Sequence, residues 1–345
     1  MSKLDELLRE LCPHGVEYKK IGKIANYEQP SKYIVESTDY NDAFDVPVLT
    51  AGQTFILGYT NESTGIFRAS KLNPVIIFDD FTGAFKWVDF SFKVKSSAMK
   101  IITASNDVSI RYLFHVMGFL HYSSNEHKRL WIGIYSEFEV PVPPLEIQRE
   151  IVRILDNFTN LTAELTAELT ARKAQYSYYR DKLLTFESRI QLLPLKDIAK
   201  FSYGYTDKAQ EHGDTRFLRI TDIAEDGTMK PEGAKYILLN DESKKYLVKK
   251  GDLLLARTGA TYGKTLYVPD NSPAVYASFL IKIELDNSKI SNRYYWHFSK
   301  SNQYWRQAEK LVSKGGQQQF NTNAVERVVV PVPPLDVQNR IVNVL

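Results

Sequence analysis

The chain has 345 residues, enough for two domains, and its 43% hydrophobic and 25% charged residues are typical of a folded, soluble protein. The net charge of +3 is too small to indicate nucleic-acid binding, so any basic surface must be local. The only cysteine is Cys12, and no secretory signal or apolar run of the ~18 residues needed for a membrane span occurs, so we expect a cytoplasmic protein without disulfides.

The first predicted domain covers residues 1–144 and is rich in strands. It opens with an amphipathic helix over 3–12, which presents four leucines on one face. Buried strands are expected at 46–49 and 75–78, loops at 61–65 and 79–83, and a further helix near 109–117. The acidic pair Asp79 and Asp80 is expected to belong to a turn rather than to a magnesium site.

A long helix is predicted over residues 145–187. The stretch follows a double proline, contains no Gly or Pro through Phe186, and places apolar residues at alternating spacings of three and four, as in a coiled coil. The spacing changes at a tandem Thr-Ala-Glu-Leu repeat, residues 162–165 and 166–169, which is a four-residue stutter. An apolar stripe of this length needs a second helix. The predicted stripe includes Ile147, Ile151, Ile154, Phe158, Leu161, Leu165, Leu169, Tyr176 and Leu183.

The second predicted domain, residues 188–334, has the same plan as the first. A strand at 253–255, a glycine-bearing loop at 258–263, a helix near 292–311 and a polar loop at 313–321 follow one another. The loop at 258–263 imitates a phosphate-binding loop, but its first glycine position is Thr258 and an extended segment follows it, so we reject that interpretation. The sequence thus predicts an α/β (α+β) fold of two similar strand-rich domains separated by a long coiled-coil helix.

An internal repeat is the strongest signal in the sequence. Residues 140–148 read Val-Pro-Val-Pro-Pro-Leu-Glu-Ile-Gln, and residues 330–338 read Val-Pro-Val-Pro-Pro-Leu-Asp-Val-Gln. Over 140–155 and 330–345, ten of the sixteen positions are identical. A weaker match links Ser-Ile-Arg-Tyr at 109–112 with Ser-Asn-Arg-Tyr at 291–294. Two similar domains joined by a helix suit the reading of two separated sites on DNA.

The chain resembles the DNA-specificity subunits of type I restriction–modification enzymes. The resemblance covers essentially the whole sequence and rests on the repeated entry into a helix described above. It also rests on Cys-Pro-His-Gly-Val at 12–16, Ala-Lys-Phe-Ser-Tyr-Gly at 199–204 and Gly-Asp-Leu-Leu-Leu-Ala-Arg-Thr-Gly at 251–259. The Thr-Ala-Glu-Leu tandem is similar to the length-variable spacer of that family, although the same residues are also good helix formers without further meaning.

The resemblance implies a division of labour between this chain and its partners. Each strand-rich domain would be a target-recognition domain for one half of a bipartite sequence in double-stranded DNA. The helices would form an antiparallel coiled coil that binds modification (methyltransferase) subunits, which restriction (endonuclease and translocase) subunits then join. Adenine methylation and cleavage, with S-adenosylmethionine, ATP and Mg²⁺, would belong to the partners. No catalytic residue, cofactor, metal or membrane contact is expected in this chain.

Candidate DNA-contacting residues are the polar, basic and aromatic side chains of predicted loops. Lys and Arg would bind phosphates, while Arg pairs with guanine and Gln or Asn with adenine. A solvated loop is the alternative explanation for each residue taken alone. The first-domain candidates are Thr50, Gly52, Thr60, Asn61, Thr82, Lys86, Trp87, Lys128 and Arg129. The second-domain candidates are Arg216, Arg219, Arg257, Thr258, Lys264, Lys314, Gln317, Gln318, Gln319 and Asn321.

Two other classes of protein remain open at this point. A stand-alone DNA methyltransferase should carry an Asn/Asp-Pro-Pro-aromatic motif, but Leu145 and Leu335 follow the double prolines, and no nuclease motif stands out. A coiled-coil scaffold without DNA readout is the other alternative. One departure from the family matters for both: residues 335–345 supply only the start of the second long helix. We therefore expect an exposed apolar stripe on the first helix and possible self-association through it.

Overall fold

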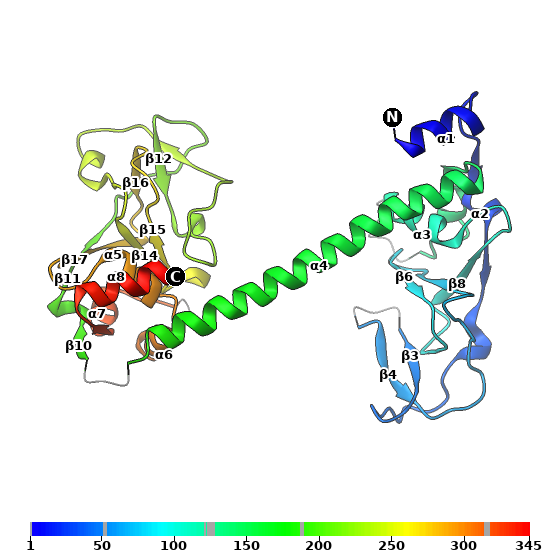
Figure 1. Ribbon diagram of the computed structural model, residues 1–345, viewed down its shortest axis with the longest axis horizontal. Coiled ribbons are helices and arrows are strands. Elements are labelled where there is room, and N and C mark those ends of the chain that lie inside the picture. Colours follow the sequence, from blue (N-terminus) through cyan, green and yellow to red (C-terminus); the bar gives the residue numbers. More distant parts are fainter. Residues whose placement is uncertain (1, 51–53, 121, 123–127, 187–189, 314–317) are drawn as a thin grey trace. The chain divides into compact units, whose positions relative to one another are not determined.

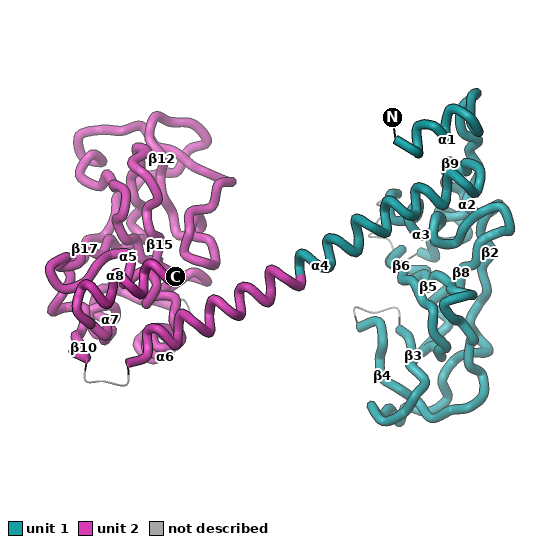
Figure 2. The backbone as a smooth tube through the Cα atoms, viewed as in Figure 1, with its two compact units in different colours: residues 1–166 teal, residues 167–345 magenta. Residues whose placement is uncertain are grey.

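The computed structural model describes residues 2–50, 54–120, 122, 128–186, 190–313 and 318–345 (Figure 1). The chain divides into two compact units, residues 1–166 and 167–345 (Figure 2). The division falls inside one helix, α4 (Leu145–Leu183), so each unit contains one end of it. Within the described ranges, no helix is both long and apolar enough to cross a membrane.

The first unit contains sheets of two, four and three strands. The two-stranded sheet pairs β1 (Tyr18–Lys20) with β9 (Glu139–Pro141). The four-stranded antiparallel sheet has the order β2 (Ala25–Glu28), β8 (Met99–Ala104), β5 (Val75–Asp79), β6 (Phe85–Val88). The third sheet has the order β4 (Ile56–Thr60), β3 (Val46–Leu49), β7 (Lys93–Val94). The helices are α1 (Lys3–Leu11), α2 (Ile21–Ile24) and α3 (Ile110–Phe119), with 3-10 helices η1 (Pro30–Tyr33) and η2 (Tyr135–Glu137).

The second unit also contains sheets of two, four and three strands. The first pairs β10 (Gln191–Pro194) with β18 (Val329–Val332), and the second has the order β11 (Ala199–Tyr203), β17 (Leu280–Leu285), β14 (Leu253–Ala256), β15 (Thr265–Tyr267). The third has the order β13 (Tyr236–Ile237), β12 (Thr215–Leu218), β16 (Ala274–Tyr276). The helices are α5 (Asn292–Phe298), α6 (Asn302–Leu311), α7 (Thr322–Val325) and α8 (Leu335–Val344), with 3-10 helices η3 (Leu195–Asp197), η4 (Ile220–Asp222), η5 (Ser243–Tyr246) and η6 (Gly259–Thr261).

The two units repeat one topology, strand for strand. In each three-stranded sheet the central strand pairs antiparallel with the strand that follows it in the chain and parallel with a later one. In each four-stranded sheet every neighbouring pair is antiparallel. Each unit then places a helix, a strand and a double proline before the next helix. The repeat predicted from sequence is therefore confirmed in the fold.

The central strands of the four-stranded sheets are buried on both faces. In β5, Ile76 and Phe78 pack towards α3, while Val75 and Ile77 pack in a second cluster with residues of the three-stranded sheet. In β14, alternate residues likewise enter two different clusters. Continuous apolar runs are the pattern expected of strands that are covered on both sides. The predicted buried strands at 46–49, 75–78 and 253–255 are confirmed.

A buried glutamine fixes the start of the helix after each double proline. The Gln148 amide donates to the carbonyl oxygens of Pro143 and Asp107 at 2.8 and 3.1 Å and accepts from the Ser109 amide at 2.8 Å. Gln338 makes the same three kinds of bond at 2.8–2.9 Å, and both glutamines are fully buried. These bonds join the helix to the segment before α3 or α5, which satisfies backbone groups that would otherwise be buried without partners.

Three predicted element boundaries are corrected by the structure. The helix predicted near 292–311 is two helices, because the Ser301 side chain accepts from the Tyr304 amide and begins α6 anew. The long helix has 39 residues and ends at Leu183 rather than at residue 187, and the next residue, Leu184, turns into the core of the second unit. The N-terminal helix ends at Leu11, one residue earlier than expected.

Candidate nucleic-acid interface

Two of the predicted polar segments of the first unit lie together. The Leu130 amide donates to the Asp80 carbonyl oxygen at 2.8 Å, and the Trp131 amide donates to the Asp80 carboxylate at 2.9 Å. These bonds place exposed Lys128 and Arg129 beside the β5–β6 turn. In that turn the hydroxyl of exposed Thr82 donates to Asp79 at 2.6 Å, and the Asp79 carboxylate also accepts from the Phe81 amide at 2.9 Å. The acidic pair therefore organises a turn, as predicted.

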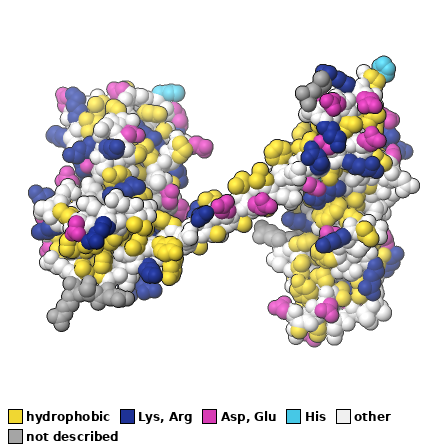
Figure 3. All heavy atoms as spheres, viewed as in Figure 1, with side chains coloured by type: hydrophobic (Ala, Val, Ile, Leu, Met, Phe, Trp, Pro, Cys, Tyr) yellow, Lys and Arg dark blue, Asp and Glu magenta, His cyan; other side chains and the backbone are white. Residues whose placement is uncertain are grey.

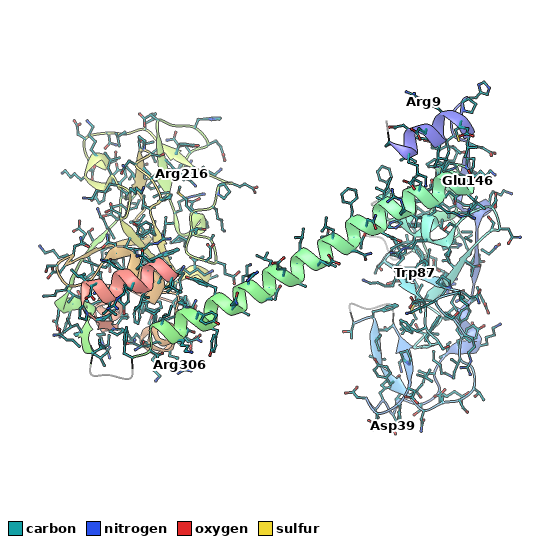
Figure 4. All side chains as sticks on the ribbon, in the orientation of Figure 1. Arg9, Asp39, Trp87, Glu146, Arg216 and Arg306 are labelled. Atoms are coloured by element: carbon teal, nitrogen blue, oxygen red, sulfur yellow. The ribbon has the colours of Figure 1, made fainter. Side chains whose placement is uncertain are left out.

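Lys86 and Trp87 point to opposite faces of β6. Residues that alternate along a strand face opposite sides of the sheet. The Trp87 ring lies edge-on to Phe114 of α3 at 5.8 Å, with the Arg111 guanidinium 4.8 Å above it (Figure 4 labels Trp87). Lys86 is exposed. The two side chains therefore do not share one surface, because Trp87 packs within the unit.

The loop after β4 is held by a buried ion pair. The Lys93 ammonium lies 2.6 Å from the Glu62 carboxylate, which also accepts from the amides of Glu36 and Ser37. Burial opposes the charge of Glu62, but Lys93 and the two amides outweigh it and hold the pKa of Glu62 below its usual value. Asn61 is exposed on this ordered loop. Thr60 is fully buried, with its hydroxyl accepting from the Glu62 amide, and its burial removes it from the candidate contacts.

The end of β3 carries the remaining candidates of the first unit. Thr50 is half-buried and its amide donates to the Phe55 carbonyl oxygen at 2.9 Å. This bond closes the loop that leads from β3 to β4. Gly52 lies outside the described residues.

In the second unit, two predicted arginines are engaged within the fold. Arg219 donates to both carboxylate oxygens of Asp222 and, at 2.8 Å, to the Gly233 carbonyl oxygen. Arg216 is half-buried and donates to the Lys230 carbonyl oxygen at 2.9 Å (Figure 4). Both arginines tie the η4 turn and its following loop to β12. Arg219 thus bonds within the fold through its Nε atom and one terminal nitrogen, and its role as a DNA contact stays a prediction.

A third arginine, Arg257, has a different environment. Its guanidinium lies between two aromatic rings, 5.0 Å from the Tyr203 centroid and 5.4 Å from the Phe279 centroid. Tyr203 is 41% exposed and Phe279 is 51% exposed. The Arg257 Nε atom donates to the Ser278 carbonyl oxygen at 3.1 Å, which orients the side chain and leaves its terminal nitrogens for other acceptors. We call Tyr203, Arg257 and Phe279 the Arg257 cluster.

The described end of the polar loop predicted near 313–321, residues 318–321, lies against the Arg257 cluster. A β-bridge joins Thr258 to Gln319, and the Phe320 amide donates to the Arg257 carbonyl oxygen at 2.7 Å. Exposed Asn321 follows and caps α7, while the Tyr203 hydroxyl lies 3.1 Å from the Thr322 hydroxyl. Gln318 is exposed, whereas Lys314 and Gln317 lie outside the described residues. Thr258 is buried, so it is not available for contact with DNA.

Lys264 belongs to a separate site. It lines a cavity of about 240 Å³ together with residues of α4, α6, the loop before β13 and the turn between α5 and α6, among them Lys173, Asp226 and Lys300. Charged groups of both signs form part of this lining, unlike the exposed aromatic surface around Arg257. Lys264 therefore lines a different surface from the Arg257 cluster, although its carbonyl oxygen accepts from the Ala256 amide at 2.9 Å.

The sequence interpretation missed Tyr203 and Phe279. Both aromatic residues sit at the ends of strand-forming segments, where such residues usually belong to the core. The neighbouring glycine, Gly204, was a usable signal, because an added Cβ there would lie 2.3 Å from two carbonyl oxygens. A backbone position that admits only glycine keeps the end of β11, and with it Tyr203, in a fixed place.

The comparisons with known proteins agree with this geometry. The family model described as "Type I restriction modification DNA specificity domain" matches residues 13–172 and again 188–345. The chain is 38% identical to the specificity subunit of the type I restriction enzyme EcoR124I/EcoR124II of Escherichia coli, over all of this chain and 89% of that protein. It is 28% identical to a putative type I specificity subunit of Haemophilus influenzae, over 96% of this chain and 86% of that protein.

Solved structures show the same fold. The S subunit of a type I restriction–modification system from M. genitalium matches with a TM-score of 0.63 at 13% identity, over 96% of this chain and 89% of that one. A chain from a structure of the type I R-M system matches with a TM-score of 0.52 at 16% identity. With two matches of the family model that together span most of the sequence, this chain belongs to the family of type I restriction–modification specificity subunits.

Proposed function

We propose that this chain recognises a bipartite sequence in double-stranded DNA, with one half read by each unit, and directs modification and restriction subunits to it. The observation that carries the proposal is the repetition of one topology on either side of α4, in a chain that matches a DNA-specificity family twice. Two copies of one fold give two related reading surfaces, and a single chain that carries both selects a target with two parts.

Affinity and specificity would come from different side chains. In the first unit, exposed Lys86, Lys128 and Arg129 would contact phosphates, which positions the unit without reading sequence. In the second unit, Arg257 is held by its neighbours and has terminal nitrogens suited to a guanine edge or a phosphate. Gln318, Gln319 and Asn321 beside it carry amides of the kind that pair with adenine.

The decisive experiment is methylome sequencing of cells that express this chain with its modification subunits. We expect methylated adenines in one split motif with a fixed gap. The purified chain alone, incubated with DNA and S-adenosylmethionine, should transfer no methyl group, since the cofactor, ATP and Mg²⁺ would act in the partner subunits. Methyl transfer by the lone chain would instead support an enzyme. Failure of the reconstituted complex to retain DNA would support a scaffold.

The Arg257 cluster gives a sharper test of DNA reading. Arg257→Ala in the reconstituted complex should weaken binding of the target duplex by roughly 10-fold or more. Loss of discrimination at one base pair would indicate a base contact, whereas uniform weakening with a smaller salt dependence would indicate a phosphate contact. The matched control is Arg306→Ala, because Arg306 is an exposed arginine of α6 in the same unit, and it should leave binding unchanged (Figure 4).

The exposed middle of α4 is the proposed surface for partner helices. Phe158, Leu161, Leu165 and Leu169 are 51–64% exposed, and Figure 3 shows hydrophobic side chains along this part of the helix. A contiguous apolar stripe on a helix is normally covered by another helix. We expect self-association or binding of modification subunits through it. A monomer in light scattering at micromolar concentration that also fails to bind those subunits would contradict this assignment.

The tandem Thr-Ala-Glu-Leu would set the gap in the DNA target. One added unit lengthens a helix by ~6 Å and returns its apolar face to within ~40° of the same direction. Since DNA rises ~3.4 Å per base pair, the gap should widen by one or two base pairs. A variant with a third copy after Leu169 should therefore methylate the same two half-sites at a larger spacing. Unchanged spacing in its methylome would make the tandem a plain helical segment.

A further inference from the structure

A carboxylate joins the last helix of the first repeat to α3. The Asp156 side chain of α4 accepts from Arg111 at 2.8 and 2.9 Å and lies 2.8 Å from the His115 Nε2 atom. The Arg111 guanidinium in turn lies 4.8 Å from the Trp87 centroid and 5.1 Å from the Phe114 centroid. Burial opposes the charge of Asp156, but its hydrogen bonds with Arg111 and His115 outweigh burial and hold the pKa of Asp156 below its usual value.

The second repeat has an arginine and a histidine at the matching positions, but no carboxylate in the part of the chain that the structure describes binds them. Arg293 and His297 stand one turn apart on α5, as Arg111 and His115 do on α3. The Arg293 guanidinium lies over Trp296 and Tyr267, at 4.2 and 4.8 Å from their centroids. Among the described residues, Arg293 forms no ion pair and the buried His297 Nε2 atom has no hydrogen-bond partner. In the first repeat, the corresponding ring nitrogen, Nε2 of His115, contacts Asp156.

The charges around His297 are mostly positive. The other ring nitrogen, Nδ1, lies 2.9 Å from the hydroxyl of Tyr176, so the ring is already fixed in place. Burial, joined by the cations of Lys300, Arg293 and Arg180, lowers the pKa of His297 to about 3. Burial also lowers the pKa of Lys300 to about 7, although Asp226 works in the opposite direction. Arg180 is paired with Asp181, but among the described residues no carboxylate forms an ion pair with Arg293, Lys300 or His297.

The internal repeat indicates where a carboxylate that corresponds to Asp156 would lie. Gln338 at the start of α8 makes the bonds that Gln148 makes at the start of α4, so the two helices begin in register. With the offset of 190, the last residue of the printed sequence, Leu345, corresponds to Leu155. The place of Asp156 is therefore the next position along the line of α8, and no residue of the printed sequence occupies it.

We propose that Arg293 and His297 form a binding site for one carboxylate, which a helical segment presents at the position that would follow Leu345. The guanidinium and the His297 Nε2 atom bind it together, as their counterparts bind Asp156. The chemistry is the same whether the carboxylate belongs to the same polypeptide or to a second copy of the chain, and two arms of the test separate these sources. The site does not involve DNA, so the test is independent of target recognition.

The first arm extends the full chain by the four residues that follow Leu155. One variant carries Asp-Asn-Phe-Thr after Leu345 and the matched control carries Asn-Asn-Phe-Thr. The aspartate variant should unfold at a temperature about 2–4 °C higher in its second unit, and Arg293→Gln should abolish this difference. In NMR titrations of the six histidines, the aspartate should also shift the His297 signals and raise its pKa. Arg306→Gln should affect neither measurement.

The second arm follows the same His297 signals in the unextended chain as its concentration rises. A shift that grows with concentration and disappears in Arg293→Gln would show that a second copy supplies the carboxylate. A constant signal, together with a response to the aspartate extension, would place the source in the same polypeptide. The proposal is overturned if the aspartate and asparagine extensions have equal melting temperatures and neither arm changes the His297 signals.

Discussion

The two repeats share a topology and a buried glutamine at the start of the helix after each double proline, but they differ in the partners of the arginine and histidine on α3 and α5. In the first repeat, the Asp156 carboxylate accepts from Arg111 and lies 2.8 Å from the His115 Nε2 atom. In the second, Arg293 and His297 occupy the same places without such a partner in the described chain. The comparison teaches that the topology depends on the buried glutamine hydrogen bonds that both repeats share. The compensation of the charged side chains on α3 and α5 depends instead on residues outside the shared core.

The largest expected effect tests what the repeats share. Gln148→Ala and Gln338→Ala should each lower the free energy of unfolding of their own unit by about 3 kcal/mol, because each leaves one amide and two carbonyl groups buried without partners. Urea unfolding of the two variants should give similar losses. Gln303→Ala, at an exposed glutamine of the second unit, is the control. A large difference in the loss of stability between the Gln148 and Gln338 variants would show that the two glutamines are not equivalent.

The next effect tests where the repeats differ. The pKa of His297 falls from an ordinary 6.5 to about 3 in the folded state, so the unfolded state binds more protons between these values. Stability that is fully present above pH 6.5 is therefore lost as the pH falls. Between pH 7 and pH 5 the loss should be about 2 kcal/mol.

This pH dependence is measured by thermal unfolding of the second unit at both pH values. His297→Gln should flatten the profile, because the amide cannot titrate in this range. His14→Gln, a change at an exposed histidine of the first unit, is the matched control and should leave the profile as it is. A second unit whose stability is equal at pH 5 and pH 7 would contradict the buried, neutral state of His297.

A smaller effect is expected at Asp156. Asp156→Asn keeps the shape but removes the charge, and should destabilise the first unit by roughly 1 kcal/mol, since the site is partly exposed. Because the pKa of Asp156 is lowered in the folded state, its contribution is present above its ordinary value of 3.8 and is lost as the pH falls. The loss should vanish in an Arg111→Gln, His115→Gln background. Glu164→Gln, elsewhere on α4, should have no effect.

The smallest effect on stability is expected in the exposed middle of α4. Leu165→Ala should change the free energy of unfolding by no more than about 0.5 kcal/mol, because this side chain is 57% exposed. The same substitution should nevertheless weaken self-association in sedimentation experiments. A large loss of stability in the monomer would mean that Leu165 packs against its own chain.

The sequence was sufficient to predict the repeat, the long helix and the buried strands, since these depend on apolar patterns and on a motif written twice. It was insufficient for single contacts. Arg219 and Thr60 read as surface groups, but one binds Asp222 and its neighbours and the other is buried under its own loop. Whether a polar side chain serves its own backbone or a ligand is decided by loop geometry, which residue type alone does not determine.

The same limit explains the missed residues. Tyr203 and Phe279 are partly exposed at the end of the sheet, with the Arg257 guanidinium against both rings. No periodic pattern marks an aromatic residue that leaves the core at the end of a strand. Gln148 was part of the recognised motif, but its burial was not predicted, because a glutamine in the first turn of a helix is usually solvated.

The threonines of α4 carry one more consequence. Thr159, Thr162 and Thr166 each donate their hydroxyl to the carbonyl oxygen four residues earlier, at 2.7–2.9 Å. Such bonds stay within the helix, so gain or loss of a Thr-Ala-Glu-Leu unit leaves no polar group without a partner and disturbs no packed neighbour. Under the proposed spacer role, gain or loss of one unit would therefore change the target spacing in one step while keeping the hydrogen bonds of the helix.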